Sequence, residues 1–268
     1  MDFLTFYKNK VVLITGGSQG IGKELAKQVL SYQGKVIITA RNAEKLLQVK
    51  KEFGLDEMTL MIHQGDVSNY QDNVDLIKKI ITQFGKLDIL ITNAGISGYG
   101  EVEIMKPEVA TQIINTNIYG TLFPIMAAIP ELKKSHGSIL LVSSVAGLSG
   151  LPGASAYSLS KMSLIALAES LSIELERYQI FVGIALPGFT KNENDKKALS
   201  PVGKSENVPE RPERFTMSRE KMASNYLSQI KNKKYYKVYT VFGLVAHFVS
   251  KYLPRIFHFI IKRKYIPA

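Results

Sequence analysis

Short apolar runs and helix-like segments alternate along most of the chain, and this order limits the folds open to it. Six runs rich in Val, Ile and Leu end in glycine or another turn residue, at 10–17, 35–40, 59–66, 87–95, 137–144 and 180–188. The segments between them have helical spacing, at 20–34, up to about Phe53, 69–85, 107–132 and 156–176. Continuous apolar strands that alternate with helices indicate right-handed βαβ crossovers and a parallel sheet covered on both faces. We predict a doubly wound, three-layer α/β/α fold.

The length and the lack of linkers favour one domain. The chain has 268 residues, 46% of them hydrophobic, and no low-complexity segment interrupts residues 9–190. We predict a single domain over 1–268. Within it, the polar, proline-containing segment 191–234 is expected to form a substrate loop or lid with some helix near 217–231, and 235–240 is a short strand candidate. An apolar and basic C-terminal segment follows, over 235–268.

The positive charge of the chain lies in that C-terminal segment. Residues 228–268 hold nine of the 34 basic residues and none of the 23 acidic ones, which leaves 25 basic against 23 acidic residues elsewhere. The apolar stretch Val238–Ser250 is too short to span a membrane, which takes about 20 residues. Three functions fit the pattern: cover of a substrate cleft, contact with a second subunit, or peripheral contact with anionic lipid. Binding of nucleic acid fits poorly, because the aromatic residues are interleaved with aliphatic ones and form no reader motif.

Composition also bears on location and on metal binding. Asp2 and a short apolar stretch begin the chain, which does not fit a signal peptide, so we expect a cytoplasmic protein, with contact to a membrane surface as an addition. There is no cysteine, and the four histidines show no metal-ligand spacing. We expect no metal site.

The segment TGGSQGIG, residues 15–22, joins the first predicted strand to the first long helix. Small residues there let the backbone approach a pyrophosphate, and the helix N-terminus supplies unpaired N–H groups and a partial positive charge. A tight turn with no ligand is the alternative, but the βαβ context favours dinucleotide binding. The predicted binding residues in this turn are Gly16, Ser18, Gln19, Gly20, Ile21 and Gly22.

The end of the second strand bears on the choice of cofactor. An acidic residue is typical at this place when the ribose 2′-hydroxyl of NAD is bound, but the chain has Thr39, Ala40, Arg41 and Asn42. Arg41, with Ser18 beside it, could pair with a 2′-phosphate, which favours NADP(H). The alternative is an ordinary solvated arginine.

Tyr157 and Lys161 lie four places apart in the last long helix of the alternating pattern. Residues at i and i+4 share a helix face, so each could be simply a packed side chain. Ser158 and Lys161 also match the S-x-x-K signature of acyl-transfer enzymes, but the S-D-N and K-T-G strings of that mechanism are absent. Taken alone, Ser144 could be a turn former at a strand end and Asn117 a solvent-facing helix residue.

The motifs together resemble the short-chain dehydrogenase/reductase family of classical type. They comprise TGGSQGIG, NAG at 93–95, Asn117 in NTNIYG, Ser144 in LVSS, YSLSK with Tyr157 and Lys161, and PGFT at 187–190, all in family order. The sequence past residue 190 is loosely similar to the branch that contains 3-ketosphinganine reductases and 11β-hydroxysteroid dehydrogenases. The resemblance implies a Rossmann-type fold, a lipophilic ketone or alcohol as substrate, and a homodimer or homotetramer. The alternative is a non-catalytic dinucleotide-binding sensor or interaction module.

The resemblance also implies a role for each matching residue. Tyr157 would be the general acid or base, Ser144 would hydrogen-bond the substrate oxygen, Lys161 would bind the nicotinamide ribose, and Asn117, in a helix irregularity, would hold a water of a proton relay. Further cofactor contacts would come from Asn42, Asp66, Val67, Asn93, Ala94, Gly95, Pro187, Gly188 and Thr190. A free phenol has a pKa near ~10, so we expect the Lys161 ammonium to lower the pKa of Tyr157. The sequence thus predicts an NADP(H)-dependent carbonyl reductase.

Overall fold

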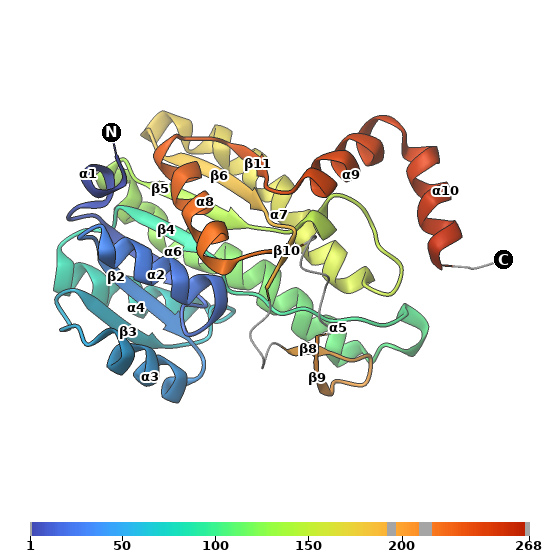
Figure 1. Ribbon diagram of the computed structural model, residues 1–268. Helices are drawn as coiled ribbons and strands as arrows, with labels where there is room; N and C mark the ends of the chain where they lie inside the picture. Colours follow the sequence, from blue (N-terminus) through green and yellow to red (C-terminus); the bar gives the residue numbers. More distant parts are fainter. Residues whose placement is uncertain (1, 192–196, 209–215, 266–268) are drawn as a thin grey trace.

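A parallel sheet of seven strands lies at the centre of the protein (Figure 1), as a computed structural model describes it for residues 2–191, 197–208 and 216–265. The strand order is β11-β6-β5-β4-β1-β2-β3, so the order reverses between β1 and β4. The predicted strand in 235–240 is present as the edge strand β11, paired with β6. The strands are β1 Val11–Thr15, β2 Lys35–Ala40, β3 Leu60–Gln64, β4 Ile89–Thr92, β5 Ser138–Val142, β6 Phe181–Leu186 and β11 Tyr236–Val238.

Helices cover both faces of this sheet, which confirms the predicted three-layer fold and single domain. One face carries α2 (Gly20–Ser31), α3 (Ala43–Phe53) and α8 (Arg219–Lys231), and the other carries α4 (Tyr70–Phe84), α6 (Gly120–Ser135) and α7 (Ser155–Glu174). Side chains of β1 alternate between two cores: Val11 and Leu13 pack on the α4–α6–α7 side, Val12 and Ile14 on the α2–α3–α8 side. This burial on both faces explains the uninterrupted apolar runs of the sequence.

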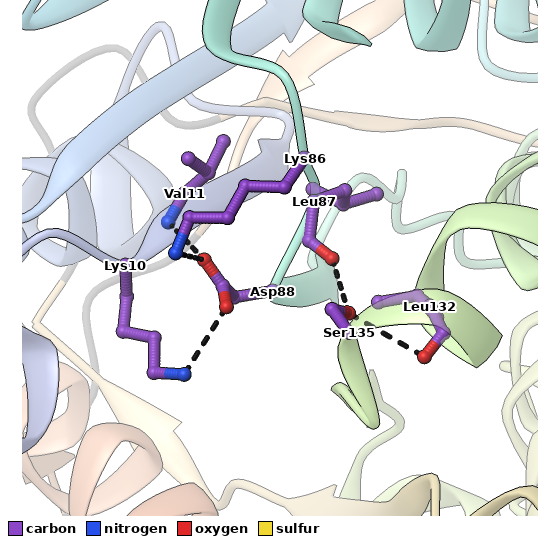
Figure 2. A network of polar contacts seen from close by, with 7 residues as sticks. All are labelled: Lys10, Val11, Lys86, Leu87, Asp88, Leu132 and Ser135. Atoms are coloured by element: carbon purple, nitrogen blue, oxygen red, sulfur yellow. Dashed lines mark hydrogen bonds and ion pairs between the residues drawn. The ribbon is translucent and has the colours of Figure 1, made fainter.

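The amino end of the sheet is fastened by the buried carboxylate of Asp88 (Figure 2). Its Oδ2 accepts from the backbone N–H of Val11 at 2.9 Å and from Lys86 Nζ at 2.8 Å, and its Oδ1 accepts from Lys10 Nζ at 3.1 Å. Burial raises the pKa of this carboxyl, but the hydrogen bonds from Lys86, Val11 and Lys10 outweigh it, so the pKa lies below the usual value of 3.8. Asp88 thereby ties the start of β1 to the start of β4.

The segment predicted as one helix over 107–132 is divided in the structure. A helix α5, Pro107–Ile114, runs into a π-helical turn, Asn115–Tyr119, and α6 continues from Gly120. The spacing of apolar residues over α5 and α6 is that of one continuous helix. The extra residue of the π-turn therefore cannot be recognised from the sequence. The helix irregularity expected around Asn117 from the family resemblance is present.

The C-terminal third contains more structure than a loop followed by a tail. Strands β8 (Lys197–Leu199) and β9 (Ser205–Asn207) form an antiparallel pair, and β10 (Thr216–Met217) pairs with β7 (Phe189–Thr190). The segment 191–234, predicted as a loop or lid with some helix near 217–231, thus contains α8 and also β8, β9 and β10, which are too short to produce a periodic signal. Part of the predicted lid, residues 192–196 and 209–215, lies outside the described residues.

Two helices, α9 (Val241–Tyr252) and α10 (Pro254–Tyr265), end the described chain and stand apart from the sheet (Figure 1). Shorter elements are α1 Phe3–Tyr7 and the 3₁₀ turns Val102–Ile104, Val145–Gly147 and Glu176–Tyr178.

Candidate active site

The glycine turn lies between β1 and α2, beside the point where the strand order reverses. Gly16 and Gly20 have φ angles of 67° and 60°, in the left-handed region that favours glycine. At Gly22 an added Cβ would lie 2.2 Å from the carbonyl oxygen of Gly16, so the first turn of α2 closes on the loop only because this residue has no side chain. The result is a bare backbone surface at the N-terminus of a helix, at the carboxyl edge of an open parallel sheet.

A cleft of about 490 Å³ opens along this edge and collects most of the predicted cofactor residues. Those that line it are Gly16, Ser18, Gln19, Gly20, Ile21, Arg41, Asn42, Asp66, Val67, Asn93, Ala94, Gly95 and Thr190. The predicted residues that do not line it are Gly22, Tyr157, Lys161, Pro187 and Gly188. Residues on the wall that were not predicted are Thr39, Ala40, Lys45, Gly65, Ile96, Thr116, Lys191 and Arg219.

Among the described residues, four cations line this cleft, and Asp66 is the one carboxylate among them. Arg41 and Lys45 lie at the end that follows β2, and Lys45 Nζ donates to Gln19 Oε1 at 2.7 Å. Lys191 and Arg219 come from the chain after β6. Lys45 could have been found from sequence, because it lies one helical turn after Arg41. No sequence signal places Arg219, at the first position of α8, near the glycine turn.

Two of the predicted cofactor residues also have local structural tasks. Asn42 is the N-cap of α3, and its Oδ1 accepts from the backbone N–H of Lys45 at 2.8 Å. The carboxylate of Asp66 accepts from the backbone N–H of Ser68 at 2.9 Å and from its hydroxyl at 2.7 Å. These bonds shape the two loops that follow β2 and β3, so both side chains are held in place on the wall of the cleft.

The side chain of Ser144 lies beside the phenol of Tyr157, close enough for a hydrogen-bond interaction that lowers the pKa of the phenol. Ser144 follows β5, and its Oγ also accepts from the backbone N–H of Ala146 at 3.1 Å, which caps a 3₁₀ turn. Burial raises the pKa of Tyr157 above its usual value of 10.0, and the interaction with Ser144 offsets part of that rise. The expected lowering of this pKa by Lys161 is therefore wrong for this structure, in which the phenol is protonated at neutral pH.

Lys161 is 5% exposed and belongs to the same helix as Tyr157. Its Nζ donates to the backbone oxygen of Val142, the last residue of β5, at 3.0 Å. Burial lowers the pKa of this ammonium from 10.5 to about 8. An added Cβ on Gly95 would lie 3.2 Å from this Nζ and 3.1 Å from Asn117 Oδ1, so both side chains converge on the loop that follows β4.

Asn117 is fully buried in the π-helical turn and clamps that loop from the other side. Its Oδ1 accepts from the backbone N–H of Ile96 at 2.8 Å, while its Nδ2 donates to the oxygen of Ile96 at 3.0 Å and to Ser160 Oγ at 2.9 Å. Both amide hydrogens are therefore used within the protein. The position of Asn117 at the site agrees with the prediction, and its part in a proton relay remains a prediction.

The loop after β6 forms the last wall of the site. The oxygen of Pro187 accepts from the backbone N–H of Val145 at 3.0 Å, which joins this loop to the turn that carries Ser144. An added Cβ on Gly188 would lie 2.7 Å from the side chain of Thr240, the N-cap of α9. The C-terminal helices therefore start beside the site.

The sheet order, the glycine turn and the cleft define a dinucleotide-binding α/β protein. The family model for short chain dehydrogenases matches residues 10–202, and the chain belongs to this family of oxidoreductases, as the motifs predicted.

Relatives of known description agree with this assignment. The 11-beta-hydroxysteroid dehydrogenase-like 4A of Arabidopsis thaliana is 37% identical over 199 residues, which cover 71% of this chain and 64% of that protein. A 3-ketodihydrosphingosine reductase of Bos taurus is 36% identical over 200 residues, which cover 70% of this chain and 60% of the relative. The match thus spans less than two thirds of either relative.

Solved structures of similar fold show the same architecture. A short-chain dehydrogenase from Streptomyces avermitilis has a TM-score of 0.79 at 21% identity, with 96% of this chain and 97% of that chain covered. An alcohol dehydrogenase from the archaeon Thermococcus sibiricus, complexed with 5-hydroxy-NADP, has a TM-score of 0.70 at 22% identity, with 84% and 91% covered.

Proposed function

We propose that this protein is an NADP(H)-dependent carbonyl reductase that acts on lipophilic ketones and, in the reverse direction, on secondary alcohols. The observation that carries the proposal is that the Ser144 side chain interacts with the phenol of Tyr157 while the buried ammonium of Lys161 lies one helical turn further along the same helix. A protein that only senses a dinucleotide needs no phenol and hydroxyl brought together in this way.

In this proposal the chain positions one proton and one substrate oxygen. The protonated phenol of Tyr157 donates to the carbonyl oxygen as that oxygen gains negative charge, and the Ser144 hydroxyl stabilises the same oxygen by a hydrogen bond. The raised pKa of Tyr157 keeps the resting side chain protonated but makes it a weaker acid, so the step needs the Lys161 ammonium and the bound cofactor to stabilise the phenolate. Lys161 holds the ribose at the nicotinamide end, and a bound reduced nicotinamide supplies the hydride.

The preference for NADP(H) is proposed from charge. The end of β2 carries no acid that would repel a 2′-phosphate, and Arg41, Lys45 and Ser18 line that end of the cleft. For Arg41→Gln combined with Lys45→Gln we expect the dissociation constant for NADPH to rise by roughly 10- to 100-fold, with little change for NADH. Titration of cofactor fluorescence measures both. Equal losses for the two cofactors would contradict the role in recognition of the 2′-phosphate.

The preference for a lipophilic substrate is supported by a second cavity. A space of about 840 Å³ opens beside residues 149–152 and 155, in the stretch of chain between Ser144 and Tyr157. Its walls include the apolar side chains of Leu151, Leu159 and Phe257. Ser144 and Tyr157 do not line this space, but Ser158, the residue after Tyr157, does, and the volume would accommodate a long apolar group of a substrate. The printed names of the relatives, a sphingoid base reductase and a hydroxysteroid dehydrogenase-like protein, point to the same substrate class.

Turnover of NADPH with a panel of hydrophobic ketones tests the proposal. The panel includes long-chain 3-keto bases and steroids, and the loss of nicotinamide absorbance is followed. Tyr157→Phe should lower the rate by about 10²- to 10⁴-fold while cofactor binding remains. Tyr70→Phe removes an exposed phenol on α4 and serves as the control. Tight NADPH binding without turnover of any ketone would instead favour the dinucleotide sensor.

A further inference from the structure

The apolar stripe of α9 faces outward instead of into the core. Five of its residues follow the spacing i, i+3, i+4, i+7 and i+11, which places them on one face of a helix. In a helix packed against a sheet such a stripe is buried. Here the side chains are largely exposed, namely Val241 at 78%, Leu244 at 52%, Val245 at 57%, Phe248 at 57% and Tyr252 at 61%.

α10 follows α9 directly and also carries exposed apolar residues, as well as apolar residues that face a cavity. Ile256, Phe259 and Ile260 are 51–62% exposed and lie on one face of the helix. Phe257 and Ile261, on the opposite face, line the cavity shared with α7. The inner side of α10 therefore accounts for its contact with the body of the protein, and the outer side needs another partner. The eight outward residues from Val241 to Ile260 are called here the α9–α10 ridge.

The charges on the two helices of the α9–α10 ridge are all positive, and the carboxylate of Glu101 approaches α10 from the body of the protein at Tyr265. Lys251, Arg255, Lys262 and Arg263 are exposed on the same two helices, and residues 228–268 contain no Asp or Glu. Figure 1 shows the two helices projecting from one side of the molecule. A second copy of the chain that docked ridge to ridge would bring cations against cations. A negatively charged surface fits both the charge and the apolar side chains.

We propose that the α9–α10 ridge docks this protein on an anionic lipid surface. Within the described part of the chain no helix is long and apolar enough to cross a bilayer, so the ridge would lie along the membrane interface. Phe248, Phe259 and their aliphatic neighbours enter the acyl boundary, while the lysine and arginine side chains reach the headgroups. Since Phe257 and Ile261 on the inner face of α10 line the 840 Å³ cavity, that cavity lies next to the docked surface. The inference does not depend on the proposed reductase activity.

Co-sedimentation of the full chain with lipid vesicles tests this inference. Wild type should bind vesicles of phosphatidylcholine mixed with phosphatidylglycerol, should bind phosphatidylcholine alone much more weakly, and should be released by high salt. Phe248→Ser combined with Phe259→Ser should weaken binding at least about tenfold through loss of buried apolar surface. Arg255→Gln combined with Arg263→Gln should weaken binding roughly tenfold on anionic vesicles only.

The matched control is Leu47→Ser combined with Lys51→Gln on α3. It removes one exposed apolar and one exposed basic residue from another face, so it should bind like wild type. Thermal unfolding of all variants checks that the fold is intact. Wild-type binding by the Phe248/Phe259 variant, or equal binding to neutral and anionic vesicles, would overturn the proposal. So would light scattering that shows a wild-type dimer reduced to a monomer by the ridge variants, because the ridge would then be an interface between copies.

Discussion

At the level of one residue, Lys161 shows that a side chain of the candidate site lowers the stability of the fold. An ammonium that is 5% exposed loses most of its hydration, and a single backbone oxygen, that of Val142, replaces part of it. Burial lowers its pKa to about 8, which means that the fold holds the charged form less well than water does. The cationic side chain is nevertheless placed where the loops after β4 and β5 meet.

Replacement of Lys161 by Met should stabilise the fold near neutral pH. The folded pKa of about 8 lies below the unfolded value of 10.5, so the unfolded chain binds more protons between these values and wild-type stability rises with pH across that window. Below pH 8 the buried charge of Lys161 lowers the free energy of unfolding by on the order of 3 kcal/mol. The variant avoids this cost but also loses the hydrogen bond to Val142, which contributes about 1–2 kcal/mol. We expect Lys161→Met to raise the free energy of unfolding at pH 7 by about 1–2 kcal/mol.

The pH dependence of this gain in stability distinguishes an effect of the Lys161 charge from an effect of side-chain packing. Urea unfolding at several pH values should show the advantage of Lys161→Met shrinking as the pH rises from 8 to 10.5. Lys221→Met, at an exposed position of α8, should show no such trend. An advantage that is the same at both ends of the window would mean that the Lys161 charge is not the cause.

At the level of elements, Asp88 fastens β1 to β4 at the end of the sheet away from the site (Figure 2). Asp88→Asn keeps the shape but loses the charge that Lys10 and Lys86 contact, and we expect about 1–3 kcal/mol less stability. The folded pKa is below 3.8, so the contribution of Asp88 is present above pH 3.8 and is lost as the pH falls through the folded value. The variant should therefore differ least from wild type in acid.

Denaturant unfolding at neutral and acidic pH measures this difference. Turnover should not change, because Asp88 precedes β4 while Asn93, on the cofactor cleft, follows it. Asp75→Asn breaks an exposed ion pair of 3.5 Å with Lys78 and is the matched control, with an expected loss near zero. A loss of activity in Asp88→Asn without loss of stability would contradict the structural role.

At the level of the whole molecule, the sequence predicts those parts whose chemistry is local. The parallel sheet and the glycine turn follow from apolar runs and from Gly16, Gly20 and Gly22, because each needs only its neighbours in the chain. The elements that position Ser144, Tyr157 and Lys161 are predicted for the same reason. The sequence cannot predict that Arg219 reaches the cofactor cleft, since that contact depends on how the chain after β6 returns to the sheet.

The pKa of Tyr157 is a second property that periodicity could not give. Spacing places Lys161 one turn away, but the direction of its ammonium, toward Val142, and the depth of the phenol depend on packing. The orientation of the C-terminal segment 235–268 likewise depends on packing. Composition showed apolar and basic residues in 235–268, whereas only the structure separates the inner face of α10 from the outward ridge.

Amide hydrogen exchange should divide the molecule into a slow sheet and a fast C-terminal pair of helices. The strands β1, β4 and β5 are buried on both faces and open only on global unfolding. α9 and α10 carry many exposed residues, and their contacts with the body include His247 with Tyr236 and a 2.5 Å contact from Tyr265 to Glu101. We expect α9 and α10 to exchange orders of magnitude faster than β5 in solution and to slow when anionic vesicles are added. α3 should not respond, and the Phe248→Ser/Phe259→Ser variant should lose the vesicle effect. Exchange in α9 and α10 as slow as in β5 without lipid would show that these helices are part of the core body instead.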